Sequence, residues 1–213
     1  MTRAQRLCDL CVSVAGVTGA ALVVGSGEGR STVCVTDGVS DRLEELQFTL
    51  SEGPAVSAEK DGWSVLAPDL SDGSQRRWPV FAPAAIEVGA RAAFALPVRL
   101  GAIRLGVLST YRSAPGNLSA DELNDAQSLA NAAAVLLCVG TGTHAAEAFM
   151  WAVGDGSRFQ PQVHQAVGAT VVQLSVSARE AFALMCAHAF ATGLPIADVA
   201  EDIMAKRMQL ESD

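Results

Sequence analysis

The sequence is poor in aromatic residues, in charge and in long apolar runs, and each shortage is informative. Aromatic residues make up 5% of the 213 residues, so aliphatic side chains and alanine must fill the core. Charged residues reach 18% against 50% hydrophobic, with a mean hydropathy of +0.28, which excludes wholesale disorder. The uncharged stretches 126–146 and 159–178 both contain glutamine, glycine and histidine. Neither is therefore the run of ~18 or more apolar residues that a membrane span needs.

Positive charge is also scarce. Lysine and arginine number 15 against 23 acidic residues, which gives a net charge of −8 and a pI of about 4.8. This balance argues against a protein that coats duplex nucleic acid, although a local patch would suffice to read a small RNA loop. The N-terminus carries charges and no long apolar segment, so it is not a signal peptide. We expect a cytoplasmic protein.

The five cysteines are an odd, scattered set, which does not indicate a disulfide framework. Cys8 and Cys11 form a CxxC without a second ligand pair, at positions i and i+3 of an N-terminal helix. They therefore either face the core or serve in redox chemistry or metal binding. No haem, metal or nucleotide fingerprint is present, so no cofactor and no metal site are expected. No Ser, His and Asp set stands in a recognisable context, which speaks against an enzyme.

Residues 1–140 alternate short helices and strands. Helices are predicted over 3–14, 40–47, 53–61, 78–88 and 118–138, and strands over 19–25, 31–36, 63–67, 91–100 and 103–111. Gly101 and Ala102 form a hairpin turn between the last two strands, and Pro97 indicates an edge or a bulge. Ser119 and Glu122 form a capping box at the start of the last helix.

The composition shifts after residue 140. Gly140 and Gly142 break the helix, and a short helix over 144–152 precedes a glycine-containing linker. Helices are then predicted over 161–174, 177–192 and 195–210, the second with a capping box of Ser177 and Glu180. The predicted fold class is α+β: a mixed domain over 1–140, a linker over 141–160 and an all-α three-helix bundle over 161–213.

Several segments occur in an order that resembles a known architecture. They are QFTLSEGPAVSA (47–58), VLAPDL (65–70), RWPVFAPAA (77–85), RAAFALPVRLGAIRLGVLSTYR (91–112) and PGNLSADEL (115–123). Together they resemble the GAF domain of bacterial GAF–ANTAR regulators, whose fold is an antiparallel sheet flanked by helices. Residues 163–207 resemble the ANTAR RNA-binding domain of the same proteins.

The resemblance implies a transcription antitermination regulator. In that family the ANTAR bundle binds paired stem-loops in nascent leader transcripts, and the GAF domain senses a signal or forms a dimer. The implied partners are therefore RNA stem-loops, a second copy of the chain and an unknown small molecule, with no membrane. We expect the dimer to form through the GAF domain and the helix over 118–138.

Polar residues on the exposed faces of the tail helices are the candidate RNA contacts. They are His164, Gln165, Arg179, His188, Lys206 and Arg207. Amides and imidazoles can reach base edges or phosphates, and Lys206 with Arg207 is the only cation pair of the module. The alternatives are buried, hydrogen-bonded histidines and a favourable positive charge at a helix C-terminus.

The tail departs from the family pattern in ways that bear on RNA binding. Cys186 stands where a basic residue is usual, and Gly168-Ala169 replaces a Gly-Met pair. From residue 141 onward there are eight acidic and four basic residues, so RNA binding is expected to be weak or to need a partner. A relative that has lost RNA contact and acts through protein contacts is the alternative.

In the GAF half, Trp63, Trp78 and Phe81 are the candidate ligand-binding residues, because they can line a pocket between sheet and helices. The alternative is that they belong to the core. A third interpretation of the whole chain is a small-molecule or redox sensor whose switch is Cys186 or the Cys8–Cys11 pair.

Overall fold

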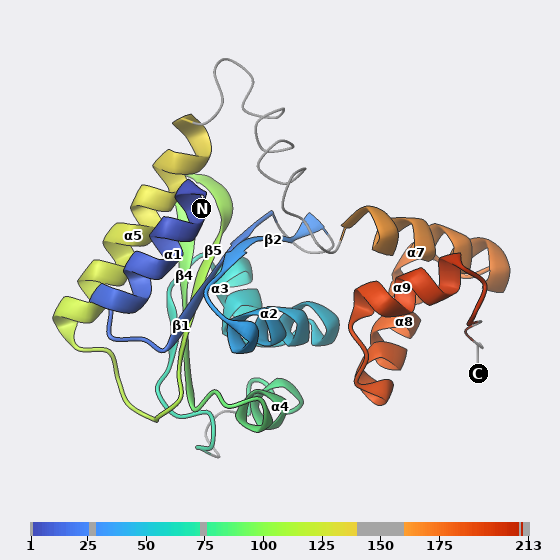
Figure 1. Cartoon of the computed structure of the whole chain (residues 1–213), viewed down its shortest axis with the longest axis horizontal. Coiled ribbons are helices and arrows are strands. Elements are labelled where there is room, and N and C mark those ends of the chain that lie inside the picture. The colour runs from blue at the N-terminus through green and yellow to red at the C-terminus, as the bar shows by residue number, and fades with distance from the viewer. Residues whose placement is uncertain (1, 26–28, 73–75, 140–159, 209, 211–213) are drawn as a thin grey trace. The chain divides into compact units, whose positions relative to one another are not determined.

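A computed structural model describes residues 2–25, 29–72, 76–139, 160–208 and 210. The chain divides into two compact units, Met1–Ser157 and Arg158–Asp213, and each is described by itself (Figure 1). The first unit, called the mixed domain here, contains α1 (Arg3–Val14), β1 (Gly19–Val24), β2 (Ser31–Val35), α2 (Gly38–Leu50), α3 (Pro54–Asp61), β3 (Val65–Ala67), α4 (Phe81–Glu87), β4 (Ala92–Leu100), β5 (Ile103–Arg112) and α5 (Ala120–Val139). The second, called the helical module, contains α7 (Gln160–Leu174), α8 (Ala178–Thr192) and α9 (Ile196–Met204).

The strands of the mixed domain form one antiparallel sheet in the order β2-β1-β5-β4-β3 (Figure 1). The predicted hairpin between β4 and β5 is confirmed, and Gly101 in its turn has a φ of +59°, which glycine adopts without strain. β3 pairs only with Ala93–Ala95 of β4. Among the described residues no strand pairs with this edge in the remainder of β4, and Pro97 lies there, as its missing N–H predicts.

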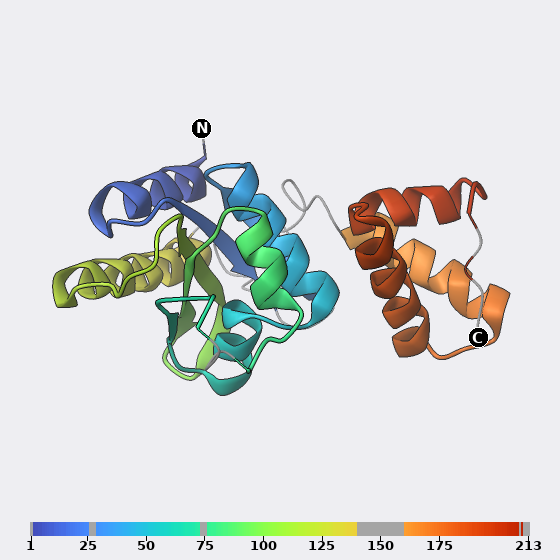
Figure 2. The same cartoon turned by 90° about the horizontal axis from the view of Figure 1, so that it is seen from below.

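The sheet separates two apolar cores, because successive residues of a strand point to opposite faces. Ala92 and Phe94 of β4 pack with α1 and α5, whereas Ala93 and Ala95 pack with α2, α3 and α4. Figure 2 shows α1 and α5 side by side. This two-sided burial explains why β4 reads as a nearly continuous apolar run.

Polar side chains fix several helix ends in the mixed domain. The predicted capping box of α5 is present: Ser119 N donates to Glu122 Oε2 at 2.7 Å, and Glu122 N donates to Ser119 Oγ at 3.2 Å. Glu52 accepts from the backbone N–H groups of Val80 and Phe81 at 3.0 and 3.1 Å. These two bonds satisfy backbone donors at the start of α4, which begins at Phe81 and not at the predicted residue 78.

The helix predicted over 40–47 is longer in the structure, where α2 spans Gly38–Leu50. Asp37 caps its N-terminus by accepting from Ser40 N at 2.7 Å, so the helix starts earlier than its apolar pattern does. The same carboxylate accepts from the hydroxyl of Tyr111 at 2.9 Å. Burial, followed by this bond to Asp37, raises the pKa of Tyr111.

The cysteines pair differently from the sequence expectation. Cys8 on α1 forms a disulfide with Cys34 on β2, so the Cys8–Cys11 switch considered from the sequence is wrong. Cys11 lies one turn further along α1 with a free, fully buried thiol. Burial raises the pKa of Cys11 to about 11, which keeps its thiol protonated at neutral pH.

The helical module packs α7 against α8 and α9 around small and branched side chains. The buried residues of this core are Val163, Ala166, Val167, Thr170, Ala181, Met185, Cys186, Ala189, Ile196, Val199, Ala200, Ile203 and Leu210. The predicted capping box of α8 is confirmed: Glu180 N donates to Ser177 Oγ at 3.2 Å, and Ser177 N donates to Glu180 Oε2 at 2.8 Å. Gly193, with a φ of +67°, ends the helix.

The third helix of the module is shorter than predicted. The expected helix over 195–210 ends at Met204, and Lys206 adopts the left-handed backbone conformation with a φ of +56°. The carbonyl of Asp202 accepts from the N–H groups of Arg207 and Met208 at 2.8 and 3.3 Å. These bonds turn the chain away from the helix axis.

The predicted linker over 141–160 and short helix over 144–152 lie outside the described residues, except for residue 160. The domain boundaries predicted around them therefore stay predictions. Within the described ranges, no single helix combines the length and apolar composition that crossing a membrane requires. Only the bent pair of Glu180–Thr192 and Ile196–Met204, at 116° to each other, satisfies that test jointly.

Candidate functional site

The predicted RNA contacts of the helical module fall on all three helices and on the turn after α9. Gln165 on α7 is exposed, and His188 on α8 is half-buried, with its carbonyl accepting from Thr192 Oγ1 at 2.7 Å. His164 lies on α7 and Arg179 in the first turn of α8, and their side chains are outside the described part of the structure. Gln165 and His188 are thus both within reach of solvent on neighbouring helices.

Lys206 and Arg207 differ sharply although they are adjacent. Arg207 Nε donates to Asp202 Oδ1 at 2.7 Å, and its Nη2 donates to Glu201 Oε1 at 3.1 Å. These bonds raise the pKa of Arg207, and the two carboxylates more than offset its charge. Lys206 is exposed and forms no ion pair with any carboxylate that the structure describes. Lys206 is therefore the better placed of the two to meet a phosphate.

Cys186 stands at the position where the family pattern usually has a basic residue. Its side chain is buried in the core of the helical module, with 6% of its surface exposed. An arginine there would have to leave the core or bury its charge, which is costly without a partner. A small, uncharged cysteine in place of the usual basic residue therefore suits this buried position. Burial also removes Cys186 from contact with oxidants in solution, contrary to its use as a redox switch.

α8 presents a mostly apolar surface. Its exposed residues include Ala183, Ala187 and Phe190, spaced by four and three positions, and Leu194 follows just after the helix end. Phe190 and Leu194 are 43% and 40% exposed. A stripe at this spacing lies on one side of a helix. We call these four residues the α8 stripe.

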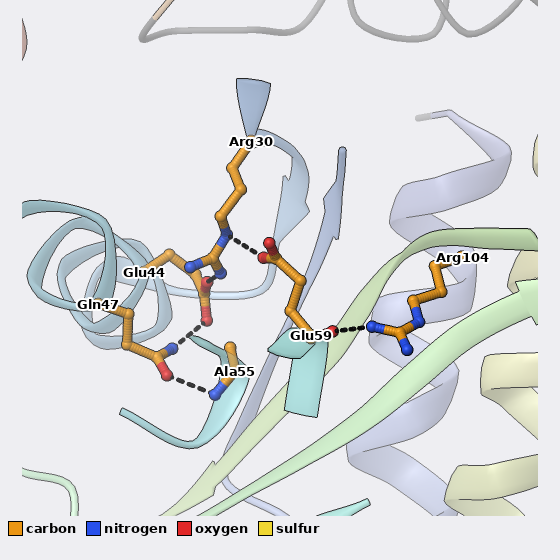
Figure 3. Close-up of polar contacts among 6 residues, drawn as sticks. All are labelled: Arg30, Glu44, Gln47, Ala55, Glu59 and Arg104. Carbon is orange, nitrogen blue, oxygen red and sulfur yellow. Dashed lines mark hydrogen bonds and ion pairs between the residues drawn. The ribbon is translucent and has the colours of Figure 1, made fainter. Parts of the chain in front are cut away.

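In the mixed domain, a buried ion pair joins Arg30, just before β2, to α2. Arg30 Nη2 donates to Glu44 Oε2 at 3.1 Å, and Arg30 Nε lies 3.5 Å from Glu59 Oε2 on α3 (Figure 3). Gln47 donates to Glu44 at 2.8 Å and accepts from the backbone N–H of Ala55 at 2.7 Å. Burial raises the pKa of Glu44, and Arg30 opposes that shift. This network fixes α2 and α3 against the sheet.

Two of the three candidate ligand-binding residues belong to this core. Trp78 and Phe81 are 3% and 1% exposed, and their rings meet edge to face with centroids 6.5 Å apart. Trp78 Nε1 donates to Ser57 Oγ at 3.0 Å, so the N–H group of the indole has its hydrogen-bond partner within the fold. Phe81 also lines a cavity of about 20 Å³ beside Glu44 and other residues of α2 and the sheet. Such a volume holds about one water molecule.

Trp63 is separate from the other two, contrary to the expectation of one shared pocket. It is 71% exposed and lines a surface hollow of about 200 Å³ between the end of α3 and the β4–β5 hairpin. The guanidinium of Arg99 lies 5.9 Å from the centroid of its ring. Most of the surface of this indole is therefore accessible to solvent.

Sequence reasoning missed the buried pair and the disulfide. Glu44 and Glu45 sit together on a helix, where acidic residues usually face solvent, and both are buried. The alternating apolar strand around Cys34 carried a signal that its thiol points inward, but not which thiol it meets. Among the described residues, no group of three histidine, cysteine or acidic side chains is arranged to hold a metal ion.

Comparison with known proteins identifies the helical module. The family model described as the ANTAR domain matches residues 159–204, which span α7, α8 and α9. Residues 159–204 therefore form an ANTAR domain, a regulatory domain type associated with RNA-binding antitermination. No curated protein sequence matches the chain.

Solved structures similar to this chain include three proteins that align with about its first two thirds. The GAF domain of an Acinetobacter phosphoenolpyruvate-protein phosphotransferase is 10% identical, with 66% of this chain and 83% of that chain covered and a TM-score of 0.49. A type II free methionine-R-sulfoxide reductase from Thermoplasma acidophilum is 14% identical, with 62% and 87% covered and a TM-score of 0.48. The GAF domain of a Bacillus halodurans two-component sensor histidine kinase is 15% identical, with 61% and 87% covered and a TM-score of 0.45.

The predicted fold class is confirmed by the structure itself. A mixed domain with a five-stranded antiparallel sheet flanked by helices precedes a helical ANTAR domain. The ANTAR domain thus follows a mixed α+β domain, in the order that the resemblance implied.

Proposed function

Since an ANTAR domain follows a mixed α+β domain, we propose that the protein is an RNA-binding regulator of transcription antitermination in the cytoplasm. The helical module binds stem-loops in nascent leader RNA, and the GAF-type domain senses a signal or forms a dimer. The observation that carries this proposal is the match of the ANTAR family model to 159–204. The protein acts by binding, and no catalytic role is assigned to any residue.

The proposed RNA-contacting residues differ in the charge that they can offer to RNA. Lys206, which has no ion-pair partner among the described residues, supplies a positive charge for phosphate. Gln165 and His188 supply hydrogen bonds, together with His164 and Arg179 on the same helices. Arg207 is held by Glu201 and Asp202, so it contributes to RNA affinity only when those carboxylates release it. The module is therefore a weak binder whose strength depends on its own acidic residues.

The test is a titration of the full chain with a two-stem-loop leader RNA at low and moderate salt. Lys206→Asn removes the charge and keeps a residue type that tolerates a positive φ. We expect weaker binding and a log–log salt slope that is shallower by about 1. The double variant Glu201→Gln/Asp202→Asn frees Arg207 and should bind more tightly, with a steeper slope.

Asp198→Asn is the matched control, because Asp198 lies exposed on the same helix and forms no ion pair among the described residues. It removes one negative charge without releasing an arginine, so its gain in affinity should be smaller than that of the double variant. Absence of saturable binding at low salt, where phosphate attraction is strongest, would overturn the proposal.

A second candidate function is regulation through protein contacts without RNA binding. It is favoured by the α8 stripe, which exposes apolar surface on a module whose arginine at position 207 is already paired. The same titration separates the two candidates. Absence of RNA binding, together with association with a partner protein that Phe190→Ser abolishes, would support regulation through protein contacts.

The proposed dimer would use the layer of α1 and α5. α1 exposes Leu10 and Val14, which are four residues apart, and α5 exposes Val135. These side chains are apolar surface that a second copy would cover. Light scattering of the wild type beside Val135→Glu tests this, and a wild type that is monomeric at high concentration would rule it out.

A further inference from the structure

The surface hollow at Trp63 has no role in the functions proposed above. It is lined by Asp61, Gly62, Trp63, Pro97, Arg99, Gly101, Ala102 and Arg104. Its walls come from the C-terminal end of α3, the segment that leads into β3, and the β4–β5 hairpin. It therefore lies in a different place from the small internal cavity beside Glu44.

Arg99 and Arg104 face each other directly across the hairpin. They are register partners in the β4–β5 pairing, and like charges directly opposite each other destabilise a sheet. Arg104 Nη1 donates to the carbonyls of Glu59 and Lys60 at 2.8 and 3.2 Å, and Arg99 Nη1 donates to the carbonyl of Gly62 at 3.4 Å. Each of these acceptors is uncharged, although the end of α3 carries a partial negative charge.

No carboxylate in the described part of the chain forms an ion pair with Arg99 or Arg104. Asp61 lines the same hollow, but its partner is Arg77, with Nη2 and Oδ2 3.4 Å apart. The hollow is thus a locally positive surface on a chain of net charge −8. An anion placed between the two arginines would relieve their repulsion.

Trp63 adds a flat aromatic surface to this positive charge. Arg99 lies over its ring, and the 71% exposure of the side chain leaves most of the ring open to solvent. Exposed tryptophan rings beside arginines are the elements with which proteins bind nucleic-acid bases and their phosphates, since every base can stack on a ring.

The fold holds these groups in place before any ligand arrives. Gly62, with a φ of +77°, ends α3 and donates to the carbonyl of Ala58 at 2.8 Å. Ser64 Oγ donates to Gln127 on α5 at 3.3 Å, so Trp63 lies between two anchored neighbours. Figure 3 shows Glu59 on α3 contacting Arg30 through its carboxylate and Arg104 through its carbonyl. Little ordering is then needed on binding.

We propose that this hollow binds a nucleotide, with the base stacked on Trp63 and the phosphate between Arg99 and Arg104. A volume of about 200 Å³ is below the ~300–1,000 Å³ of sites that enclose a whole ligand, so only part of the ligand enters. A free nucleotide and one nucleotide of a single-stranded RNA share this chemistry. The RNA source rests on the proposed function, in which the strand flanks the stem-loops held by the helical module.

The experiment measures binding of the full chain to AMP and to an unstructured RNA hexamer, with ribose 5-phosphate and inorganic phosphate as the base-free probes. Calorimetry gives the affinities, and anisotropy of the labelled hexamer gives the salt slope. Trp63→Ala should weaken hexamer binding by about 5- to 150-fold, the range seen for loss of one stacked base. Trp63→Phe should retain most of the affinity, because a ring remains. Arg99→Gln should reduce the salt slope by about 0.7.

Arg91→Gln is the matched control, since Arg91 is exposed just before β4 begins, at the opposite end of that strand from Arg99. It should change neither affinity nor slope. Binding of AMP identifies a free nucleotide as a ligand, and binding of the hexamer alone identifies the strand. Equal binding of ribose 5-phosphate and AMP, or no effect of Trp63→Ala, would overturn the proposal.

Failure of this site and failure of RNA stem-loop binding are distinguishable. Loss of stem-loop binding in Lys206→Asn with unchanged AMP and hexamer binding in Trp63→Ala would leave the proposed function standing and remove the nucleotide site. The reverse result, hexamer or AMP binding that depends on Trp63 in a protein that binds no stem-loop, would keep the site and remove the proposed function.

Discussion

The mixed domain and the helical module treat charge in opposite ways. The mixed domain buries Arg30 and Glu44 inside the fold, whereas no charged residue described in the helical module is buried. On the surface the contrast reverses: Arg207 of the module is held by two carboxylates, while Arg99 and Arg104 of the mixed domain donate to backbone carbonyls and form no ion pair with a carboxylate that the structure describes. Opposite charges hold elements together inside the first unit, whereas in the second unit the two carboxylates beside Arg207 more than offset its positive charge. The family match to the helical module therefore does not tell which positively charged side chains are free of carboxylate partners and able to bind phosphate.

The largest effect is expected from breaking the buried pair. Arg30→Met should lower the free energy of unfolding of the mixed domain by about 3–5 kcal/mol at neutral pH, because it leaves the Glu44 carboxylate buried without its charge partner. Urea unfolding followed by tryptophan emission measures this. Arg42→Met is the control, since the Arg42–Glu45 pair is partly exposed and should contribute about 1 kcal/mol or less.

The deficit of Arg30→Met should depend on pH. Burial already raises the pKa of Glu44, so its folded state keeps a proton where the unfolded state loses it, and stability falls as pH rises above the ordinary value of 4.5. Without Arg30 the pKa of Glu44 rises further. The deficit is therefore expected to be smaller at pH 5 than at pH 8, and a deficit independent of pH would show that Glu44 is not the group responsible.

Reduction of the disulfide should come next in size and should act on the mixed domain alone. The bond closes a loop with a sequence separation of 26, for which the chain-entropy model gives about 3.5 kcal/mol. A reductant, or Cys8→Ser, should lower the unfolding midpoint followed by Trp63 and Trp78. Cys186→Ser lies in the helical module and should leave that midpoint unchanged. Insensitivity of the wild type to reductant would mean that Cys8 and Cys34 are not bonded in solution.

The smallest expected loss of stability comes from removing the serine of a capping box, a feature that both units contain. Ser119→Ala and Ser177→Ala each remove one member of a capping box, and each should cost about 1 kcal/mol in its own unit. The bonds to these serines lower the pKa values of Glu122 and Glu180. This stability is present above the ordinary glutamate pKa and is lost as pH falls through the lowered values. Circular dichroism melts at pH 7 and pH 3 test both, and a cost of the same size at the two pH values would argue against a contribution from the carboxylates.

The elements that sequence predicted best were those whose signals are local. α1 has the predicted bounds, and the capping boxes of α5 and α8 are present because their residues are three positions apart. The predicted third helix ran too far, since alanine and two basic residues favour a helix. The bonds that end it at Met204 come from Asp202 and could not be read from periodicity.

The candidate sites were less predictable because they depend on distant residues. Arg30 meets Glu44 across 14 positions, and Cys8 meets Cys34 across 26. Composition also cannot say which tryptophan is buried: Trp78 donates to Ser57 inside the core, and Trp63 stands exposed. Whether the six proposed RNA contacts act as such stays a prediction for the titration.

The short pairing of β3 has a consequence for behaviour at high concentration. β3 covers only Ala93–Ala95, and no other strand among the described residues pairs with that edge in the second half of β4. Unpaired strand edges are surfaces on which identical molecules add to one another and form aggregates. Pro97 lacks the N–H that such stacking requires, and Arg99 adds charge beside it. We therefore expect these two residues to act as gatekeepers against self-assembly at the part of β4 that β3 does not cover.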